Sequence, residues 1–362
     1  MSIPKTWVTF LLATAAIASC RGDRPSEQKS GATQPKPGAT ETAAPVGPVT
    51  LNASGSTFQK PFQEVAIEAF THKNSGVKIN YGGGGSGKGR QDLSDMVVDY
   101  AGSDSPFKDA DKPKIKGGEI LYFPVLLGAV TVSYNVDAVD SLQLSPVTIA
   151  KIFQREITKW NAAEIAADNP GAKLPNTEIV VVHRSDGSGT TDNFTKYLDK
   201  AANGSWKLKS GSTVEWPADT QAGNGNSGVA QIVKSTKGSI GYVDLSDARA
   251  SKLIYAAVQN KSGKFITPNV QTASAAGDGI EIANDLLFSA LNAKTDSAYP
   301  ITCQSWVIVY AKQNDKAKGT ALKNYLKFLL TDAQALLPDL DFAPLPKSLQ
   351  DKALAQIDKI QL

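Results

Sequence analysis

The sequence predicts an α/β protein made of two lobes, with a mainly parallel sheet. Three times between residues 49 and 106 a strand ends in a small-residue turn, and a helix follows the first two turns, which is the order typical of α/β architecture. Two long apolar runs, at 123–134 and 301–310, are long enough to cross from one lobe to another. The chain has 362 residues, which is more than one compact core usually holds. These three observations together predict two lobes joined by crossing strands.

The N-terminus predicts a secretory signal over residues 1–19. Lys5 precedes an uncharged run at 6–19 that is rich in Leu and Ala. The run is shorter than the ~20 apolar residues that span a bilayer, but it fits the apolar region of a signal peptide. It ends in Ile17-Ala18-Ser19-Cys20, which resembles a bacterial lipobox and makes Cys20 the expected lipid attachment site. The alternative is a plain signal peptide with an incidental cysteine.

Residues 20–48 predict a disordered tether behind the lipidated cysteine. The stretch 21–48 has five prolines and no aromatic residue, Leu or Ile, so it has nothing with which to build a core. The folded part is expected to begin near Val49. We expect lobe 1 to comprise residues 49–126 and 301–362, and lobe 2 to comprise residues 127–300.

Apolar spacing predicts the main elements of the two lobes. Ser145 and Pro146 are a cap residue and a first-turn proline, and they precede a helix that carries Ile149 and Phe153. The other expected strands lie at 77–81, 179–182 and 239–243, and the other expected helices at 58–70, 189–198, 280–291 and 316–330.

An anion site is predicted where the strand at 179–182 meets the following helix. A helix N-terminus carries about half a positive charge and four unpaired N–H donors. Arg184 adds a planar, bidentate donor, and Asp186 is placed to hold that guanidinium. Ser188, Gly189 and Thr190 add N–H groups and hydroxyls. The alternative for Arg184 and Asp186 is an exposed local ion pair.

Three more strands end in small-residue turns, at Ser56-Thr57, at Ser86 and at Asp104. Ligands of open α/β sheets bind at the carboxyl ends of strands. A carboxylate such as Asp104 repels a fully ionised anion and attracts one that still carries a proton. It therefore favours phosphate over sulfate. The alternative for Asp104 is a turn or helix-cap aspartate.

The glycine run at 82–89 matches the phosphate-binding pattern Gly-x-x-x-x-Gly-Lys, but Gly89 stands where that pattern needs Ser or Thr. An exported protein also meets little nucleotide, so nucleotide binding is disfavoured. A flexible loop without a ligand remains an alternative. The preferred interpretation is a tight loop that exposes N–H groups and the Ser86 hydroxyl at a strand end.

Composition narrows the classes of function. A net charge of +3 gives no support for a nucleic-acid partner, and two histidines with two cysteines leave little for a metal site. We expect no metal and no cofactor. Cys303 lies in an apolar strand and reads as a small buried hydrophobe. No Gly-x-Ser-x-Gly motif occurs, so an enzyme is not expected, although His183 beside the anion site leaves a hydrolase open.

From Leu51 to the C-terminal helices the chain resembles the PstS-type phosphate-binding proteins, the extracytoplasmic receptors of phosphate ABC transporters. The residues that carry this resemblance are Gly55 to Phe58, Ser86-Gly87, Ala101 to Asp104, Arg184 to Thr190, Gly238 to Val243 and Tyr299 to Ile301. The resemblance implies a type II periplasmic-binding-protein fold with the ligand in the cleft between the lobes. Two departures are Gln59, where proline is frequent, and Gly87, where a second serine is common.

The resemblance also implies a role for each matching residue. Thr57 and Phe58 would bind phosphate through their N–H groups, Thr57 also through its hydroxyl, and Ser86 through its hydroxyl and N–H. Asp104 would accept the phosphate proton. Arg184, Ser188, Gly189 and Thr190 would complete the shell, with Asp186 orienting Arg184.

The expected function is capture of inorganic phosphate outside the cytoplasm and its delivery to an ABC permease. The expected location is the periplasm or cell surface, with a membrane anchor at Cys20, and the protein is expected to be a monomer. Three alternatives remain: a binding protein for sulfate, molybdate or arsenate; a surface protein that only senses phosphate supply; and an exported phosphoester hydrolase.

Overall fold

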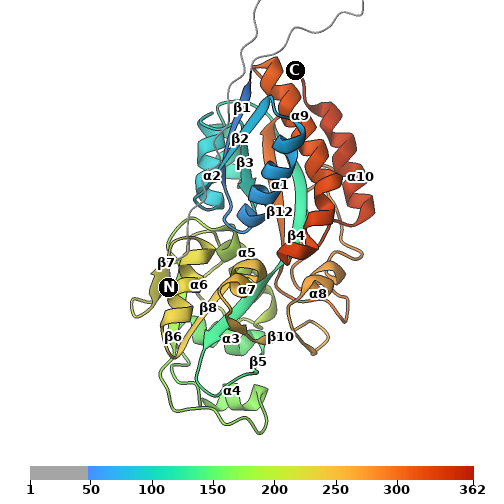
Figure 1. The fold of residues 1–362 in the computed structure, drawn as a ribbon. Coiled ribbons are helices and arrows are strands. Elements are labelled where there is room, and N and C mark those ends of the chain that lie inside the picture. Colours follow the sequence, from blue (N-terminus) through green and yellow to red (C-terminus); the bar gives the residue numbers. More distant parts are fainter. Residues whose placement is uncertain (1–47) are drawn as a thin grey trace, which may run out of the picture. The chain divides into compact units, whose positions relative to one another are not determined.

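Two long strands lie side by side at the centre of the sheet. β4 (Ile120–Asn135) pairs antiparallel with β12 (Thr302–Tyr310) (Figure 1). Every residue of β12 is buried, and so is every residue of β4 except its two ends. Strands covered on both faces read as continuous apolar runs. The long strands predicted at 123–134 and 301–310 are therefore confirmed.

The structure is a computed structural model that describes residues 48–362. The expected signal segment, the expected lipid attachment site Cys20 and the tether up to residue 47 lie outside the described residues. The first strand, β1 (Val49–Gly55), begins where the folded part was predicted to begin.

The first strand group consists of β1, β2 (Val77–Gly83), β3 (Tyr100–Ser103) and β12, in the order β2-β1-β3-β12. β1 runs parallel to both β2 and β3. The helices that accompany this group are α1 (Lys60–Lys73), α2 (Ser86–Ser94), η1 (Asp109–Lys114), α9 (Lys316–Leu330), η2 (Asp332–Leu336), η3 (Pro338–Leu340), α10 (Lys347–Gln356) and η4 (Ile357–Lys359). Helix α9 packs against both β1 and α1.

The second strand group consists of β8 (Ser239–Asp244), β6 (Val180–Arg184) and β7 (Gln221–Gly223), with β6 parallel to both neighbours. β9 (Ile254–Tyr255) pairs with β4. A small separate sheet contains β5 (Gln143–Leu144), β10 (Ala257–Gln259) and β11 (Phe265–Ile266). The helices here are α3 (Pro146–Phe153), α4 (Ala163–Asp168), α5 (Gly189–Ala201), α6 (Gly225–Ser235), α7 (Leu245–Ala250) and α8 (Val270–Ala275).

β4 belongs to both strand groups. Its residues from Ile120 to Ala129 pair with β12, and those from Val130 to Asn135 pair antiparallel with β8. Figure 1 shows β4 running on from the first strand group into the second. The division into lobes at 126/127 and 300/301 stays a prediction.

Some elements match the sequence predictions and others do not. α9 has the predicted bounds, and Ser145 caps α3 by accepting a hydrogen bond from the Thr148 N–H at 3.3 Å. The prediction of a mainly parallel sheet is wrong, because β12 runs antiparallel to β3 and β4, and β4 runs antiparallel to β8.

The helix predicted at 280–291 is also wrong, since this segment is irregular. Leu286 has a φ of +62°, and the Asp285 carboxylate accepts the Leu287 N–H at 3.1 Å. A short acidic side chain that bonds the nearby backbone in this way competes with the helix.

Within residues 48–362 no helix is long and apolar enough to cross a membrane. Cys303 has no exposed surface, as predicted for a small buried residue, and within the described part of the chain it forms no disulfide.

Candidate functional site: two facing polar clusters

The loop between β6 and α5 carries the predicted anion-binding residues. β6 ends at Arg184, and α5 begins at Gly189. Ser188 is the N-cap of α5, and its hydroxyl accepts the Thr191 N–H at 3.1 Å. The N–H groups of Gly189 and Thr190 precede the first intrahelical donor and have no acceptor among the described residues. The start of α5 therefore offers free donors, as the sequence predicted.

Arg184 is held in place by three partners. Its Nε donates to Asp186 Oδ1 at 2.7 Å, and its Nη2 donates to Asp186 Oδ2. Its Nη1 donates to Asn226 Oδ1 at 2.8 Å and approaches the Thr190 hydroxyl at 3.4 Å. Only 1% of the Arg184 side chain is exposed. The alternative of an exposed local ion pair is thus wrong, because the pair is buried and Asp186 accepts two hydrogen bonds from the guanidinium.

The electrostatics of Asp186 follow from this pairing. Burial by itself would raise the pKa of Asp186, but the hydrogen bond and charge of Arg184 outweigh it and hold the pKa below its usual value. The Asp186 carboxylate also accepts the Gly225 N–H at 3.1 Å. Asp186 is therefore a stable anion that fixes both the guanidinium and the start of α6.

A second polar cluster lies at the ends of β1 and β3 and at the start of α2, centred on Asp104. The Ser56 hydroxyl donates to Asp104 at 2.7 Å from Oδ1 and 2.6 Å from Oδ2. The Ser86 hydroxyl lies 3.2 Å from Oδ2, and the Ser305 hydroxyl donates to Oδ1 at 2.5 Å. The parallel strands β1 and β3 end at the same edge of the sheet, which brings Ser56 and Asp104 together.

Asp104 is 1% exposed. Burial holds the pKa of this carboxyl above its usual value, and the hydroxyls of Ser305, Ser56 and Ser86 together with the charge of Arg184 offset only part of that rise. Among the described residues the Asp104 carboxylate accepts from the hydroxyls of Ser56, Ser86 and Ser305 and from no backbone N–H, unlike a turn or helix-cap aspartate. It is a buried acceptor that three hydroxyls surround.

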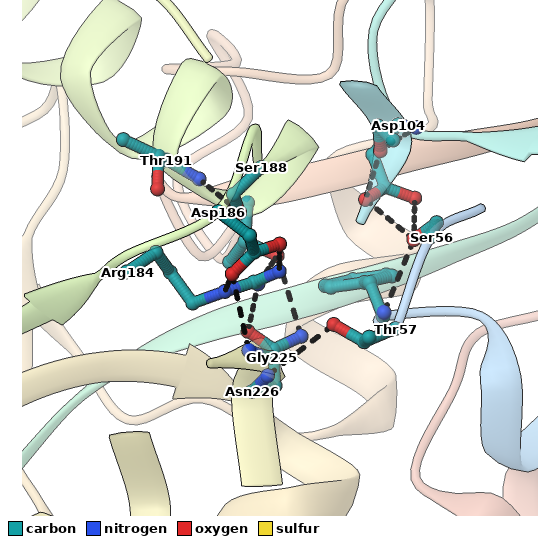
Figure 2. A network of polar contacts seen from close by, with 12 residues as sticks. Ser56, Thr57, Asp104, Arg184, Asp186, Ser188, Thr191, Gly225 and Asn226 are labelled. Atoms are coloured by element: carbon teal, nitrogen blue, oxygen red, sulfur yellow. Dashed lines mark hydrogen bonds and ion pairs between the residues drawn. The ribbon is translucent and has the colours of Figure 1, made fainter. Parts of the chain in front are cut away.

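The two clusters face each other (Figure 2). The Asn226 N–H donates to the Thr57 hydroxyl at 3.2 Å, and the Asn193 Nδ2 donates to the Asp104 carbonyl at 2.7 Å. The backbones also meet, because the Gly87 N–H donates to the Gly187 carbonyl at 2.7 Å. The structure thus brings residues of the first strand group into direct contact with residues of the second.

Some of the backbone N–H groups that are predicted to bind phosphate have no acceptor in the described structure, and one is already hydrogen-bonded. Those of Thr57 and Ser86 have no acceptor among the described residues, as at Gly189 and Thr190. The Phe58 N–H donates to the Ser56 hydroxyl at 3.0 Å. The binding roles of Thr57, Phe58, Ser86, Asp104, Arg184, Ser188, Gly189 and Thr190 remain predictions, although the structure gathers these residues at one place.

The glycine run does not form a nucleotide cradle. The N–H groups of Gly84 and Gly85 donate to the Gly55 carbonyl at 3.1 and 2.9 Å, and that of Gly87 donates to Gly187. The loop is instead tied to its neighbours, and it leaves the Ser86 N–H at the start of α2 free of any partner within residues 48–362.

The sequence predicts no binding role for three residues of the site, Ser56, Asn226 and Ser305. Ser56 was seen only as part of a turn, and its hydroxyl proves to contact Asp104. Asn226 lies in the small-residue segment that follows β7 and begins α6. This is a fourth small-residue segment at a strand end, and it could have indicated Asn226 as a site residue. Ser305 lies inside a buried apolar strand, where a lone hydroxyl was the only hint.

No metal-ligand cluster stands out among the described residues, and the ring of His183 is held by its neighbours. Residues 48–362 contain no cluster of three or more His, Cys, Asp or Glu side chains suited to a metal. The Nδ1 of His183 lies 3.0 Å from the Arg184 carbonyl oxygen, and its Nε2 lies 3.0 Å from the Thr220 hydroxyl. Its ring stacks on Trp216, and burial lowers the pKa of His183. Both ring nitrogens are thus engaged, one by the main-chain carbonyl of Arg184 and the other by the Thr220 hydroxyl.

Comparison with known proteins places this geometry in a family. A model of the PBP superfamily domain matches residues 32–333. The phosphate-binding protein PstS of Xylella fastidiosa (strain Temecula1) is 34% identical over 348 residues, which cover 94% of each chain. The phosphate-binding protein PstS of Methanocaldococcus jannaschii is 37% identical over 310 residues, which cover 79% of each chain.

Solved structures agree on the fold. A high-affinity periplasmic phosphate-binding protein (PfluDING) bound with phosphate superimposes with a TM-score of 0.72 at 20% identity, covering 85% of this chain and 94% of its own. The phosphate-binding protein of Stenotrophomonas maltophilia gives a TM-score of 0.68 at 18% identity, with 85% and 94% covered. The chain has the type II periplasmic-binding-protein fold, and it belongs to the PstS family of phosphate-binding proteins.

Proposed function

We propose that this protein binds inorganic phosphate outside the cytoplasm and delivers it to the permease of a phosphate ABC transporter. One observation carries the proposal: the fixed cation Arg184 and the free N–H groups at the start of α5 face a buried acceptor, Asp104. The names of the relatives, phosphate-binding protein PstS, point the same way.

The donors supply affinity. Charge-assisted hydrogen bonds contribute about 1.5–3 kcal/mol each, so the guanidinium and a few N–H groups suffice for tight binding of a small anion. In the proposed shell Thr57, Phe58 and Ser86 bind one side of phosphate, with the Phe58 N–H shared between the ion and the Ser56 hydroxyl, and Arg184, Ser188, Gly189 and Thr190 bind the other. Asp186 supports Arg184 by holding its guanidinium in a single orientation.

Asp104 supplies selectivity. A buried carboxylate between hydroxyl donors attracts the P–OH of phosphate, whereas sulfate has no proton to offer it at neutral pH. A site whose buried polar group is left unpaired rejects the wrong ligand by about 10⁴-fold or more. The same reasoning leaves arsenate, which also carries a proton, as the closest competitor.

Capture and release require the two clusters to separate. Thr57 and Gly225 line a cavity of about 300 Å³, together with Lys60, Glu64 and Asp247. We propose that the two lobes rotate about β4 and β12, and that closure brings Asn226 onto Thr57 around the bound ion. The protein would act as a monomer, held at a membrane by a lipid on Cys20.

Titration calorimetry of the purified protein tests the binding function. Phosphate is expected to bind, sulfate is expected not to bind, and Arg184→Ala is expected to lose phosphate binding while remaining folded. Turnover of a chromogenic phosphate ester would instead revive the hydrolase alternative. Equal binding of sulfate would favour a general oxyanion receptor.

A further inference from the structure

A buried line of hydrogen bonds runs from two tyrosines to Asp104. The hydroxyls of Tyr100 and Tyr325 donate to Gln63 Oε1 at 3.0 and 2.8 Å. Gln63 Nε2 donates to Gln59 Oε1 at 2.9 Å, and Gln59 Nε2 donates to the Ser305 hydroxyl at 2.8 Å. The Ser305 hydroxyl completes the line at Asp104 Oδ1. None of the side chains of this line is exposed by more than 1% of its residue's surface.

The orientation of Gln59 sets the direction of this line. Its Nε2 also lies 3.0 Å from the Trp306 carbonyl, which only accepts hydrogen bonds. The amide nitrogen of Gln59 must therefore face Trp306 and Ser305, and its oxygen must face Gln63. Ser305 accepts from Gln59, so its own hydrogen is directed at Asp104.

The other two hydroxyls at Asp104 are arranged in the same way. The Ser56 oxygen accepts the Phe58 N–H at 3.0 Å, which leaves its hydrogen for Asp104. The Ser86 oxygen accepts the Asp104 N–H at 3.1 Å, which leaves its hydrogen for Oδ2 or for a ligand. In each case an N–H group occupies the serine oxygen and turns the hydroxyl hydrogen toward the carboxylate.

The number of acceptor positions on the Asp104 carboxylate limits which hydrogens it can bind. An ionised carboxylate has about four acceptor positions. The hydroxyl hydrogens of Ser56 and Ser305 fill two of them, that of Ser86 fills a third when it is not donated to a ligand, and at least one position remains for a proton that a ligand brings. A protonated Asp104 would bring a fourth hydrogen into a cluster whose serine oxygens already accept from N–H groups.

We propose that Gln59 and Ser305 are positioning residues that keep Asp104 an acceptor, so that the site takes an oxyanion only when the anion itself carries a proton. The proposal rests on the proposed phosphate-binding function and assigns its selectivity to residues that do not touch the ion. Asp104 itself is the group that meets the ligand.

Other ionisable groups interact with Asp104 through their charge. They are Arg184 of β6, Arg90 of α2, Tyr81 of β2 and Cys303 of β12. Arg184 favours the ionised carboxylate, and Arg90 adds to that preference. A substitution at Ser305 leaves both arginines in place. A Ser305 variant therefore isolates the contribution of the Ser305 hydroxyl to the ionisation of Asp104.

The test compares Ser305→Ala with Ser305→Thr, which restores the hydroxyl, and with Gln59→Met, which removes the donor behind it at similar volume. Without ligand, the Asp104 carboxyl is followed by carbon NMR over a pH range, with Asp104→Asn to assign its signal. The carboxyl is expected to titrate at higher pH in Ser305→Ala and Gln59→Met than in the wild-type protein, and Ser305→Thr is expected to match the wild type. An unchanged titration in Ser305→Ala overturns the proposal.

Ligand binding gives the second readout. At about pH 5, Ser305→Ala is expected to bind phosphate about tenfold or more weakly than the wild type, with the gap narrowing toward about pH 8, and to gain measurable sulfate binding. A loss of the same size at every pH, with sulfate still rejected, would mean that the hydroxyl only supports the loop and would overturn the proposal. A wild-type protein that binds no phosphate while the Asp104 titration shifts as expected would refute the proposed function and leave the role of Ser305 intact.

Discussion

The backbone N–H of Asn226, in the first turn of α6, donates a hydrogen bond to the Thr57 hydroxyl at 3.2 Å, across 169 residues of sequence. The same asparagine uses its side-chain oxygen to accept from Arg184 Nη1 at 2.8 Å. Asn226 therefore connects the turn after β1 to the guanidinium at the end of β6. Two polar clusters that are far apart in the sequence become one site through this residue.

The Thr57 hydroxyl is expected to contribute to ligand affinity through this contact. Thr57→Val keeps the shape of the side chain but leaves the Asn226 N–H without its acceptor. A net hydrogen bond is worth about 0.5–1.5 kcal/mol, so phosphate binding is expected to weaken by roughly three- to tenfold or more. Thr57→Ser, which keeps the hydroxyl, is the matched control and is expected to bind nearly as the wild type. Equal affinities for all three proteins would count against the contact.

Gly189 is expected to be essential for bringing the two clusters together. A Cβ at this position would lie 2.4 Å from Ser86 Oγ and 2.7 Å from the Asp104 Cβ. Gly189→Ala is therefore expected to weaken phosphate binding at least tenfold and to leave the unfolding temperature of the ligand-free protein nearly unchanged. Gly76→Ala is the control, because nothing lies within 4 Å of its added Cβ. Normal binding by Gly189→Ala would mean that the clusters need not approach this closely.

Arg184 is expected to act through its geometry as well as its charge. Arg184→Lys keeps the charge but loses the planar fork that binds Asp186 and Asn226 together. Calorimetry is expected to find phosphate affinity reduced by about two orders of magnitude or more in this variant. Arg155, which pairs with Asp219 at 2.8 Å, provides the comparison, and Arg155→Lys is expected to bind as the wild type. Full affinity in Arg184→Lys would show that any cation serves.

The lowered pKa of Asp186 predicts that the stability of the folded protein depends on pH. Its folded-state pKa lies below the usual Asp value of about 3.9, so the folded protein holds this proton less readily than the unfolded chain. The stabilisation that it gives is present above about pH 4 and is lost as the pH falls through the folded-state pKa. The difference in unfolding free energy between the wild type and Asp186→Asn, measured with urea, is therefore expected to shrink as the solution is acidified below about pH 4.

Asp219→Asn is the control for this experiment. The pKa of Asp219 is also lowered, by Arg155, but 61% of its side chain is exposed, so water screens the pair. Its effect on stability is expected to be small at every pH. A difference for Asp186→Asn that stays constant with pH would mean that ionisation of Asp186 contributes nothing to folding.

Local patterns were sufficient to predict much of the fold. The continuous apolar runs of β4 and β12 indicated strands that are buried on both faces. Ser145 and Pro146 correctly indicated the start of α3. The prediction of a helix at 280–291 was wrong because the apolar residues of this irregular segment pack against the core without forming a helix. The Asp285 side chain also accepts a hydrogen bond from the nearby backbone. The direction of β4 relative to β8 depends on how distant segments pair, and composition carries no record of that pairing.

The site was predictable only as far as it follows strand ends. Ser86, Asp104 and Arg184 stand at such ends, so their convergence follows from the topology of an α/β sheet. Ser305 lies within β12, and its meeting with Asp104 depends on strand register, which the sequence does not reveal. Asn226 contacts Thr57 through a backbone N–H, which every residue except proline has, and the meeting of its side chain with Arg184 depends on where α6 begins.

The ratio of phosphate to sulfate affinity in the wild type and in Asp104→Asn tests the central claim most directly. Asparagine has nearly the same shape as aspartate but carries no charge, and its amide nitrogen donates hydrogen bonds. By competition calorimetry at neutral pH, the wild-type protein is expected to bind phosphate and reject sulfate, and Asp104→Asn is expected to lose most of that preference. A wild-type protein that binds sulfate as tightly as phosphate, or an Asp104→Asn variant that still rejects sulfate, would contradict the claim that Asp104 opposite Arg184 selects the ion.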